Sequence, residues 1–296
     1  MNLGAIHAIV PMACVFAAAI AAMVAEAFRK PGERLPIAPL GVIGLVGAAA
    51  SAYLLWSQNA ASFGVVLADN YSLFVAWTLI IVGLLTLGLS VPTIEREGLP
   101  AGEYYSLMLF SLGGMILMAM ATDLLVIFLA LEVLSLGVYV LTGIRRDSPT
   151  ATEAAFKYFL LGAFASAFFL YGIAFTYGVT GTTNLQRIGE AMAAQSMAPT
   201  MMQLFAMGML LIGFAFKVSA VPFHMWTPDA YEGAPPPVTG FMSTGVKAAA
   251  FAAFARVFLT SFEPLHGDWS PIVWLVAAAT MIVGTVVGVA QNSVKR

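Results

Sequence analysis

Charged residues are scarce in this chain of 296 residues, because Asp, Glu, Lys and Arg make up only 9% of it. Soluble domains carry about 25% charged residues, since a surface that faces water has to be polar. Apolar residue types account for 60% of the sequence and the mean hydropathy is +0.91, more apolar surface than a soluble globule of this size could bury. The composition excludes a soluble enzyme and predicts an integral membrane protein.

Cysteine, histidine and an excess of basic residues are also lacking. Cys14 is the only cysteine, which excludes a disulfide framework and a cysteine-ligated metal centre. The three histidines do not pair within one predicted helix, so haem ligation is not expected. Thirteen Lys and Arg against 15 Asp and Glu leave no basic surface for nucleic acid. The phosphate-binding P-loop motif does not occur, so ATP is not expected to drive this chain directly.

Long apolar runs are what the sequence has in abundance. A helix needs about 20 apolar residues to cross the hydrocarbon core of a bilayer. The runs are continuous rather than alternating, which favours helices over a barrel, and no strands are expected. We therefore predict an all-α, polytopic transmembrane bundle of about nine helices. They are placed at residues 5–28, 38–57, 71–91, 104–121, 124–143, 153–178, 201–222, 238–259 and 271–290.

The basic residues in the connecting loops predict the orientation. One side of the membrane would hold eight of them, namely Arg29, Lys30, Arg34, Arg96, Arg145, Arg146, Lys295 and Arg296. The other side would hold Arg187 and, at most, Arg256. Because short cytoplasmic loops are rich in Lys and Arg, the N-terminus is predicted on the periplasmic side.

Four charged residues lie inside the apolar runs. Glu132 and Lys247 are predicted near the middle of their helices, Lys217 lies five residues before Pro222, and Lys157 lies early in its helix. A charge at the bilayer centre costs about 2.5–3.5 kcal/mol on insertion scales, so such residues are usually functional. Alternatives are a lysine side chain that reaches the head groups, above all for Lys157, and a Glu–Lys pair kept for packing.

These residues suggest a proton relay. Burial disfavours an ammonium ion and a nearby carboxylate favours it, so a buried lysine between the two effects can exchange a proton with water. We hypothesise that Glu132 pairs with Lys217. Pro222 can break a membrane helix and expose backbone carbonyls along an ion path, although it can equally mark a helix end. His224 could exchange protons or could simply bond a loop carbonyl at the interface.

Two other residues are assigned structural places. Asp123 is expected to be exposed in a tight turn, and Trp226 is expected in an interfacial aromatic belt together with Trp56, Trp269 and Trp274. The pair Gly113-Gly114 predicts a close contact between helices.

Three segments resemble a known family. They are LLVIFLALEVLSLGVYVLTG around Glu132, EAAFKYFLLGAFASAFFLYGIAFTYGVTGT around Lys157, and PFHMWTPDAYEGAPPPVTGFMSTGVKAA from Pro222 to Ala249. All three are similar to the subunit N family of the proton-pumping NADH:quinone oxidoreductase, respiratory complex I. Subunits L and M and the related sodium/proton antiporters share a Pro-His-Trp-Pro-Asp element. The sequence HMWTPDAYEGAP of this element here is more similar to subunit N.

The resemblance implies a fold and a set of site residues. It implies five-helix repeats with one discontinuous helix each, here at Pro222. Glu132 would tune a lysine, Lys217 would be the protonatable centre, and Lys247 would be the connecting lysine. Lys157 would match a further lysine of the subunit N pattern, and His224 would belong to the proton entry path on the cytoplasmic side. The chain would divide into three N-terminal helices (1–103), a first antiporter-like repeat of five helices (104–259) and the start of a second repeat (260–296).

The resemblance also implies a context. The chain would be a proton-translocating enzyme subunit of complex I with no redox centre and no metal or cofactor of its own, while NAD(H), FMN, Fe–S clusters and quinone would belong to the assembled complex. Its partners would be other membrane-arm subunits and the lipid bilayer of the bacterial inner membrane, with no nucleic acid. A cation/proton antiporter subunit and a membrane scaffold are the alternatives. Subunit N usually has about fourteen helices, so the sequence is expected to be a C-terminally truncated fragment.

Overall fold

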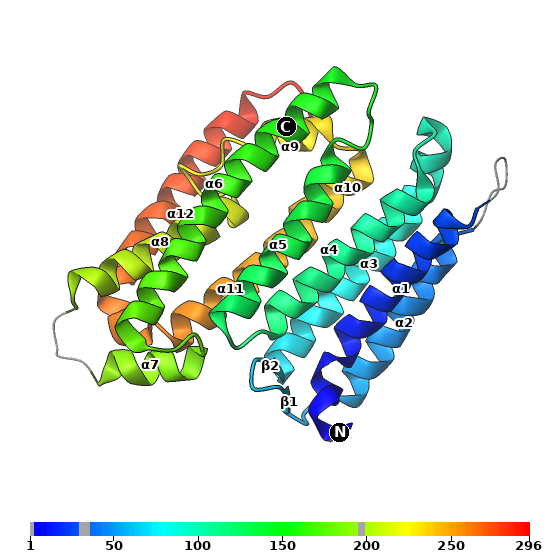
Figure 1. Ribbon diagram of the computed structural model, residues 1–296. Coiled ribbons are helices and arrows are strands. Elements are labelled where there is room, and N and C mark those ends of the chain that lie inside the picture. Colours follow the sequence, from blue (N-terminus) through cyan, green and yellow to red (C-terminus); the bar gives the residue numbers. More distant parts are fainter. Residues whose placement is uncertain (1–2, 30–35, 195–198) are drawn as a thin grey trace.

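The structure is a computed structural model that describes residues 3–29, 36–194 and 199–296. Long helices run side by side across the molecule (Figure 1). The N-terminus lies at one end of these helices, near the strands β1 and β2, and the C-terminus lies at the other end, near α9. Lys30 and Arg34, which contribute to the predicted charge asymmetry, fall outside the described residues.

Nine apolar passes account for most of the described chain. Eight are long and apolar enough to cross a membrane, and the ninth, α2, is a shorter apolar helix. The predicted all-α polytopic bundle of about nine helices is therefore confirmed. The helices are η1 Leu3–Ile9, α1 Val10–Ala27, α2 Ala38–Leu54, α3 Asn70–Glu97, α4 Ala101–Met120, α5 Leu124–Thr142, α6 Pro149–Thr180, α7 Leu185–Ala193, α8 Met201–Val218, α9 Thr227–Gly233, α10 Pro236–Phe241, the π-helical turn η2 Met242–Val246, α11 Lys247–Thr260, η3 Glu263–Leu265 and α12 His266–Val289.

Capping residues set the ends of the longest helices. The Ser148 hydroxyl accepts a hydrogen bond from the Ala151 amide at the start of α6, and Gly181 adopts a left-handed conformation at its end. These caps extend α6 beyond the predicted 153–178, because hydropathy marks the apolar stretch whereas the caps mark where backbone hydrogen bonding stops.

A short β-hairpin corrects the expectation that the chain has no strands. β1 (Ala60–Ser62) pairs antiparallel with β2 (Val66–Ala68) in the connection between α2 and α3. Phe63 and Gly64 turn the chain between them with positive φ angles of 54° and 71°. Strands of three residues are too short to produce a recognisable alternation, so the sequence pattern misses them.

Asp123 and Trp226 are buried, contrary to their predicted places. Asp123 is only 9% exposed, because its carboxylate accepts hydrogen bonds from the Leu125 amide at the start of α5 and from the Thr183 hydroxyl. Trp226 is 2% exposed and lies in the bundle rather than in an interfacial belt. In both cases a neighbour distant in sequence covers the side chain.

The predicted discontinuous helix is present. α8 ends at Val218, Ser219 takes a left-handed conformation with φ of 60°, and α9 begins only at Thr227. We call residues 219–226, which include Pro222, the α8 break. The next pass is also irregular, since the π-helical turn η2 immediately precedes Lys247.

Packing places this break beside the middle of the bundle. α4 packs against α1 and α5, α6 packs against α5, α8 and α9, and α11 contacts α4 and α8. Gly114 on α4 lies against the α5 backbone at Ala130 and Leu134, which confirms the predicted close contact. α12 lies at the outside, with Trp269 as its one buried residue (Figure 1).

Candidate functional site

Glu132 projects from α5 toward α6. Its carboxylate oxygen Oε1 accepts a hydrogen bond of 2.5 Å from the Ser166 hydroxyl. The side chain is half-buried, so a charged or polar partner is needed to offset its removal from water. Ser166 on α6 supplies a neutral partner.

Lys217 is the most deeply buried charged residue of the cluster, with 2% of its surface exposed. Its ammonium group donates to the Ser135 hydroxyl over 2.7 Å, and that hydroxyl donates to the Leu131 carbonyl. Three aromatic rings lie near the same ammonium, at 5.3 Å for Tyr139, 5.8 Å for Tyr158 and 6.0 Å for Phe216. A hydroxyl and three ring faces thus surround this cation.

Glu132 and Lys217 belong to one cluster but make no direct contact. Among the ion pairs within 4.0 Å in the described part of the chain, none joins them. Ser135 lies three residues after Glu132, so both side chains lie on one side of α5. In this structure Glu132 and Lys217 are therefore neighbours on one side of α5, and Ser135 contacts Lys217 in place of Glu132. A small void beside it is lined by Leu131, Gly162, Ala165, Ser166, Phe169, Gly213, Phe216 and Lys217.

Lys247 reaches the α8 break from α11. Its ammonium donates to the backbone carbonyl of Lys217 over 2.8 Å and also to the Ser219 hydroxyl. The carbonyl is free to accept because α8 ends one residue later. Lys247 thereby joins the same cluster, and the negative end of the α8 dipole faces its charge.

The α8 break is held together by side chains. The Trp226 indole donates to the Phe216 carbonyl over 3.1 Å, and the Thr227 hydroxyl donates to Ser219 over 2.7 Å. Trp226 also stacks on Tyr158 of α6, with ring centroids 4.2 Å apart and planes 5° apart. The break is therefore a defined structure whose carbonyls and hydroxyls face the lysines.

His224 and Lys157 lie apart from this cluster. His224 is half-buried within the break, and its Nδ1 has no hydrogen-bond partner among the described residues. Lys157 is exposed and forms ion pairs with Glu153 at 2.7 Å and Asp229 at 2.8 Å. This geometry fits the alternative that Lys157 reaches toward the membrane surface.

Asp229, at the start of α9 and outside the membrane passes, binds two positively charged side chains. It binds Lys157 and also Arg296, at 3.0 Å. The hydrogen bond from Lys157, with the two positive charges, lowers the pKa of the Asp229 carboxyl and outweighs the opposing effect of partial burial. The carboxylate remains ionised and helps to fix α9.

Sequence reasoning overlooked the contacts of the cluster. These residues are Ser135, Tyr139, Tyr158, Ser166, Phe216, Ser219 and Trp226. The helical spacing of Glu132, Ser135 and Tyr139 was a usable signal. Most of the other contacts join elements distant in sequence, and hydropathy carries no information about them.

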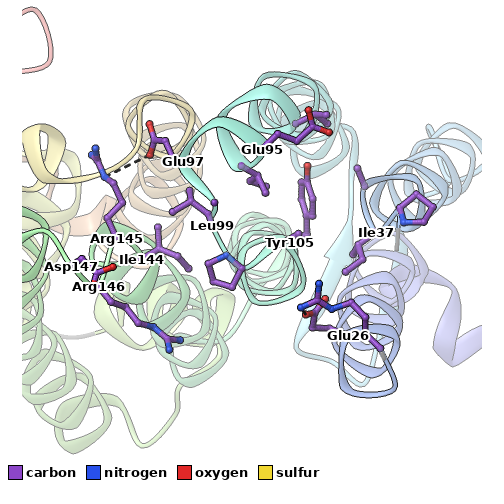
Figure 2. A pocket seen from close by; sticks show the side chains of 18 of the residues that line it. Glu26, Ile37, Glu95, Glu97, Leu99, Tyr105, Ile144, Arg145, Arg146 and Asp147 are labelled. Carbon is purple, nitrogen blue, oxygen red and sulfur yellow. Dashed lines mark ion pairs between the residues drawn. The ribbon is translucent and has the colours of Figure 1, made fainter. Parts of the chain in front are cut away.

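A wide cleft in the described residues lies elsewhere. It has a volume of about 1210 Å³ and is formed at the ends of α1, α2, α3, α4 and α5, where Glu97 faces Arg145 (Figure 2). None of the five predicted site residues lines it. In the part of the chain that the structure describes, no group of three or more His, Cys, Asp or Glu side chains could hold a metal ion. The site of interest is therefore the buried cluster.

A comparison with protein families decides the relationship. The family model described as "NADH:quinone oxidoreductase/Mrp antiporter, TM" matches residues 121–296, more than half of the chain. The chain belongs to this family. The matched region contains Glu132, Lys217, Lys247, Lys157 and His224, and hence every predicted site residue.

Individual relatives with curated names are similar to most of the chain. The chain is 42% identical over 292 residues to the NADH-quinone oxidoreductase subunit N of Trichlorobacter lovleyi, which covers 98% of the chain and 60% of that relative. It is 41% identical to the subunit N of Chloroflexus aggregans, over 97% of the chain and 59% of the relative. The chain thus spans about 60% of the length of these curated relatives.

Solved structures share the fold. A chain of respiratory complex I from Thermus thermophilus matches with a TM-score of 0.77 at 36% identity, over 96% of this chain and 60% of that one. A chain of the Mrp complex from a Dietzia species matches with a TM-score of 0.77 at 21% identity, over 98% of this chain and 55% of that one. The second likeness shows the fold alone.

Proposed function

We propose that this chain is a proton-translocating membrane subunit of an NADH:quinone oxidoreductase. The observation that carries the proposal is the cluster of charged side chains beside the α8 break. Lys247 donates there to the Lys217 carbonyl, and Glu132 lies one helical turn from Ser135, the hydroxyl partner of Lys217. Charges at such depth are costly and mark proton paths in membrane proteins. The 42% identity to a subunit N supports this function over other membrane functions.

The geometry suggests how protons would move. Lys217 would hold a proton as an ammonium ion against Ser135, and Lys247 would hold one against Ser219. A movement that brings Glu132 toward Lys217 favours the ammonium form, and a movement that separates them favours release. The Thr227–Ser219 hydrogen bond extends the polar contacts from Lys247 to α9, near His224. Electron transfer elsewhere in the complex would drive these movements.

The proposal includes the surroundings of the chain. NAD(H), FMN, Fe–S clusters and quinone would be bound by other subunits of the complex, with this chain as a translocase subunit among other membrane-arm subunits. It would reside in the bacterial inner membrane with its N-terminus on the periplasmic side, as the loop charges predict. The division into residues 1–103, 104–259 and 260–296 stays a prediction.

Substitutions in the cluster test the function in the assembled complex. We expect Lys217→Ala to reduce NADH-driven proton uptake into inverted membrane vesicles by about tenfold or more, because a proton carrier is removed. Glu132→Gln should reduce it less, since Lys217 keeps its Ser135 partner. Thr285→Ala, on the exposed face of α12, is the control, and immunoblots report the amount of complex.

The alternatives predict other outcomes. Assembled complex with normal pumping in Lys217→Ala would overturn the relay and leave a scaffold. Sodium-dependent transport in proteoliposomes would instead favour a cation/proton antiporter.

A further inference from the structure

In the described part of the chain, neither the buried Lys217 nor the half-buried Lys247 has a carboxylate within ion-pair distance. The exposed Lys157 binds two carboxylates, whereas no ion pair within 4.0 Å in the described part of the chain involves Lys217 or Lys247. A buried ammonium ion without a counter-charge needs another source of stabilisation. Hydroxyls and the Lys217 carbonyl supply part of it, and the aromatic rings around these lysines are a further source.

Trp226 is the ring that faces Lys247. The Lys247 ammonium lies 4.7 Å from the centroid of the Trp226 ring. The face of an aromatic ring carries partial negative charge, which attracts a cation most strongly when water is excluded, and tryptophan is the best of the three ring types. Trp226 is 2% exposed, so this attraction operates in a dry environment.

Trp226 is also fixed in place from two other directions. Its indole N–H donates to the Phe216 carbonyl, which holds the ring against the end of α8. Its face stacks on Tyr158, and the Tyr158 ring lies 5.8 Å from the Lys217 ammonium. A single stack of two rings therefore contacts both lysines.

We propose that Trp226 is a positioning residue for proton translocation, which holds the protonated Lys247 at the α8 break and, through Tyr158, fixes its place relative to Lys217. This inference rests on the proposed function. Trp226 does not exchange protons itself. It acts through Lys247, whose ammonium it retains beside the Lys217 carbonyl and Ser219.

Other titratable groups near Trp226 would share in a pH effect. From the elements packed around it these are Tyr139 of α5, Tyr158 of α6, Lys217 of α8, His224 of the break, Tyr231 of α9 and Lys247 of α11. Tyr158 and Tyr231 are neutral near pH 7, and the ring of Tyr231 meets that of Trp226 edge-on at 6.1 Å. Lys247 is the cation over the Trp226 ring.

The test distinguishes the electrostatic effect of the Trp226 ring face from the effect of side-chain volume. In the assembled complex, Trp226→Leu keeps an apolar side chain but removes the ring, and Trp226→Phe restores a ring without the N–H donor. We expect Trp226→Leu to reduce proton uptake at least about threefold and to move the alkaline limb of its pH profile to lower pH by about half a unit. Trp226→Phe should recover part of both changes.

A second measurement covers the case in which Trp226→Leu fails to assemble. Site-specific incorporation of tryptophans with one to three ring fluorines at position 226 weakens the negative ring face and preserves its shape. We expect the pH profile to shift progressively with fluorine number. An unchanged profile across the fluorinated series would overturn the inference.

The outcomes also distinguish this inference from the function on which it rests. Normal pumping in Lys217→Ala would refute the proposed function itself. Loss of pumping in Lys217→Ala, together with an unshifted pH profile in the fluorotryptophan series, would refute only the role of Trp226.

Discussion

The Lys217 ammonium donates to Ser135, and the Ser135 hydroxyl in turn donates to the Leu131 carbonyl. Glu132 uses a hydroxyl in the same way, as the acceptor for Ser166. Hydroxyls can donate and accept at once, so they stabilise a charge without fixing it as firmly as an opposite charge would. At the residue scale, neutral polar groups therefore keep the acid and the bases of the cluster apart.

Removal of the Ser135 hydroxyl is expected to impair Lys217 directly. In Ser135→Ala the buried ammonium loses its hydrogen-bond acceptor, which costs about 1–3 kcal/mol. Proton uptake by membrane vesicles should fall several-fold, and Ser135→Thr should restore most of it. Ser51→Ala is a matched control, because Ser51 on α2 also donates to the carbonyl of its own helix but contacts none of the cluster. Equal losses in both alanine variants would contradict this role.

At the scale of elements, an ion pair fastens α11 to the start of α3. Asp69 caps α3 by accepting from the Ser72 amide, and Arg256 of α11 binds its carboxylate with two hydrogen bonds of 2.8 and 3.1 Å. Arg256 also lies over the Tyr71 ring at 5.0 Å. The position of α11, which carries Lys247, thus depends on a contact at the N-terminal side of the molecule.

The Asp69 ion pair should make stability depend on acid pH. Partial burial alone would raise the pKa of Asp69, but the hydrogen bonds from Arg256 and Ser72 and the charge of Arg256 outweigh it, so the pKa is lowered. The stabilisation is present above the unfolded-state pKa of about 3.9 and is lost as pH falls through the lower folded-state value.

Asp69→Asn is therefore expected to destabilise the complex-bound or detergent-purified chain by about 1–3 kcal/mol at pH 7 and by less near pH 3. Thermal unfolding at the two pH values measures the difference. Asp268→Asn, at an exposed carboxyl in the first turn of α12, serves as the control. A deficit of Asp69→Asn that is the same at both pH values would refute the assignment.

At the scale of the whole molecule, charged side chains gather at the two opposite ends of the membrane-spanning helices. Arg145 lies at the end that also holds Glu97 and Lys295, where it donates to the Gly233 and Ala234 carbonyls. Arg256 lies with the β-hairpin at the opposite end, next to the N-terminal side. This arrangement agrees with the alternation of loops that the orientation argument assumes.

Labelling of introduced cysteines is expected to reveal the orientation. In a Cys14→Ser background, Asp268→Cys should react with a membrane-impermeant maleimide in intact spheroplasts, because its loop is predicted to be periplasmic. Asp147→Cys, in the loop after α5, should react only in inverted vesicles. Both positions are exposed, so accessibility within the protein does not bias the comparison. The reverse pattern would show that the N-terminus is cytoplasmic.

The sequence by itself determined the class of the protein, the nine apolar passes and the costly charges Glu132, Lys217 and Lys247. These features depend on the transfer of each residue between water and lipid, which is a property of the residue and its close neighbours. The relation to complex I subunits was also visible in the segments around these charges.

Only the tertiary structure decided what each charge contacts. Lys217 meets Ser135 across 82 positions of sequence and Lys247 meets the Lys217 carbonyl across 30. The burial of Trp226 against Tyr158 has the same origin. Such contacts arise from how whole helices pack and where α8 breaks, and local hydropathy does not encode that packing.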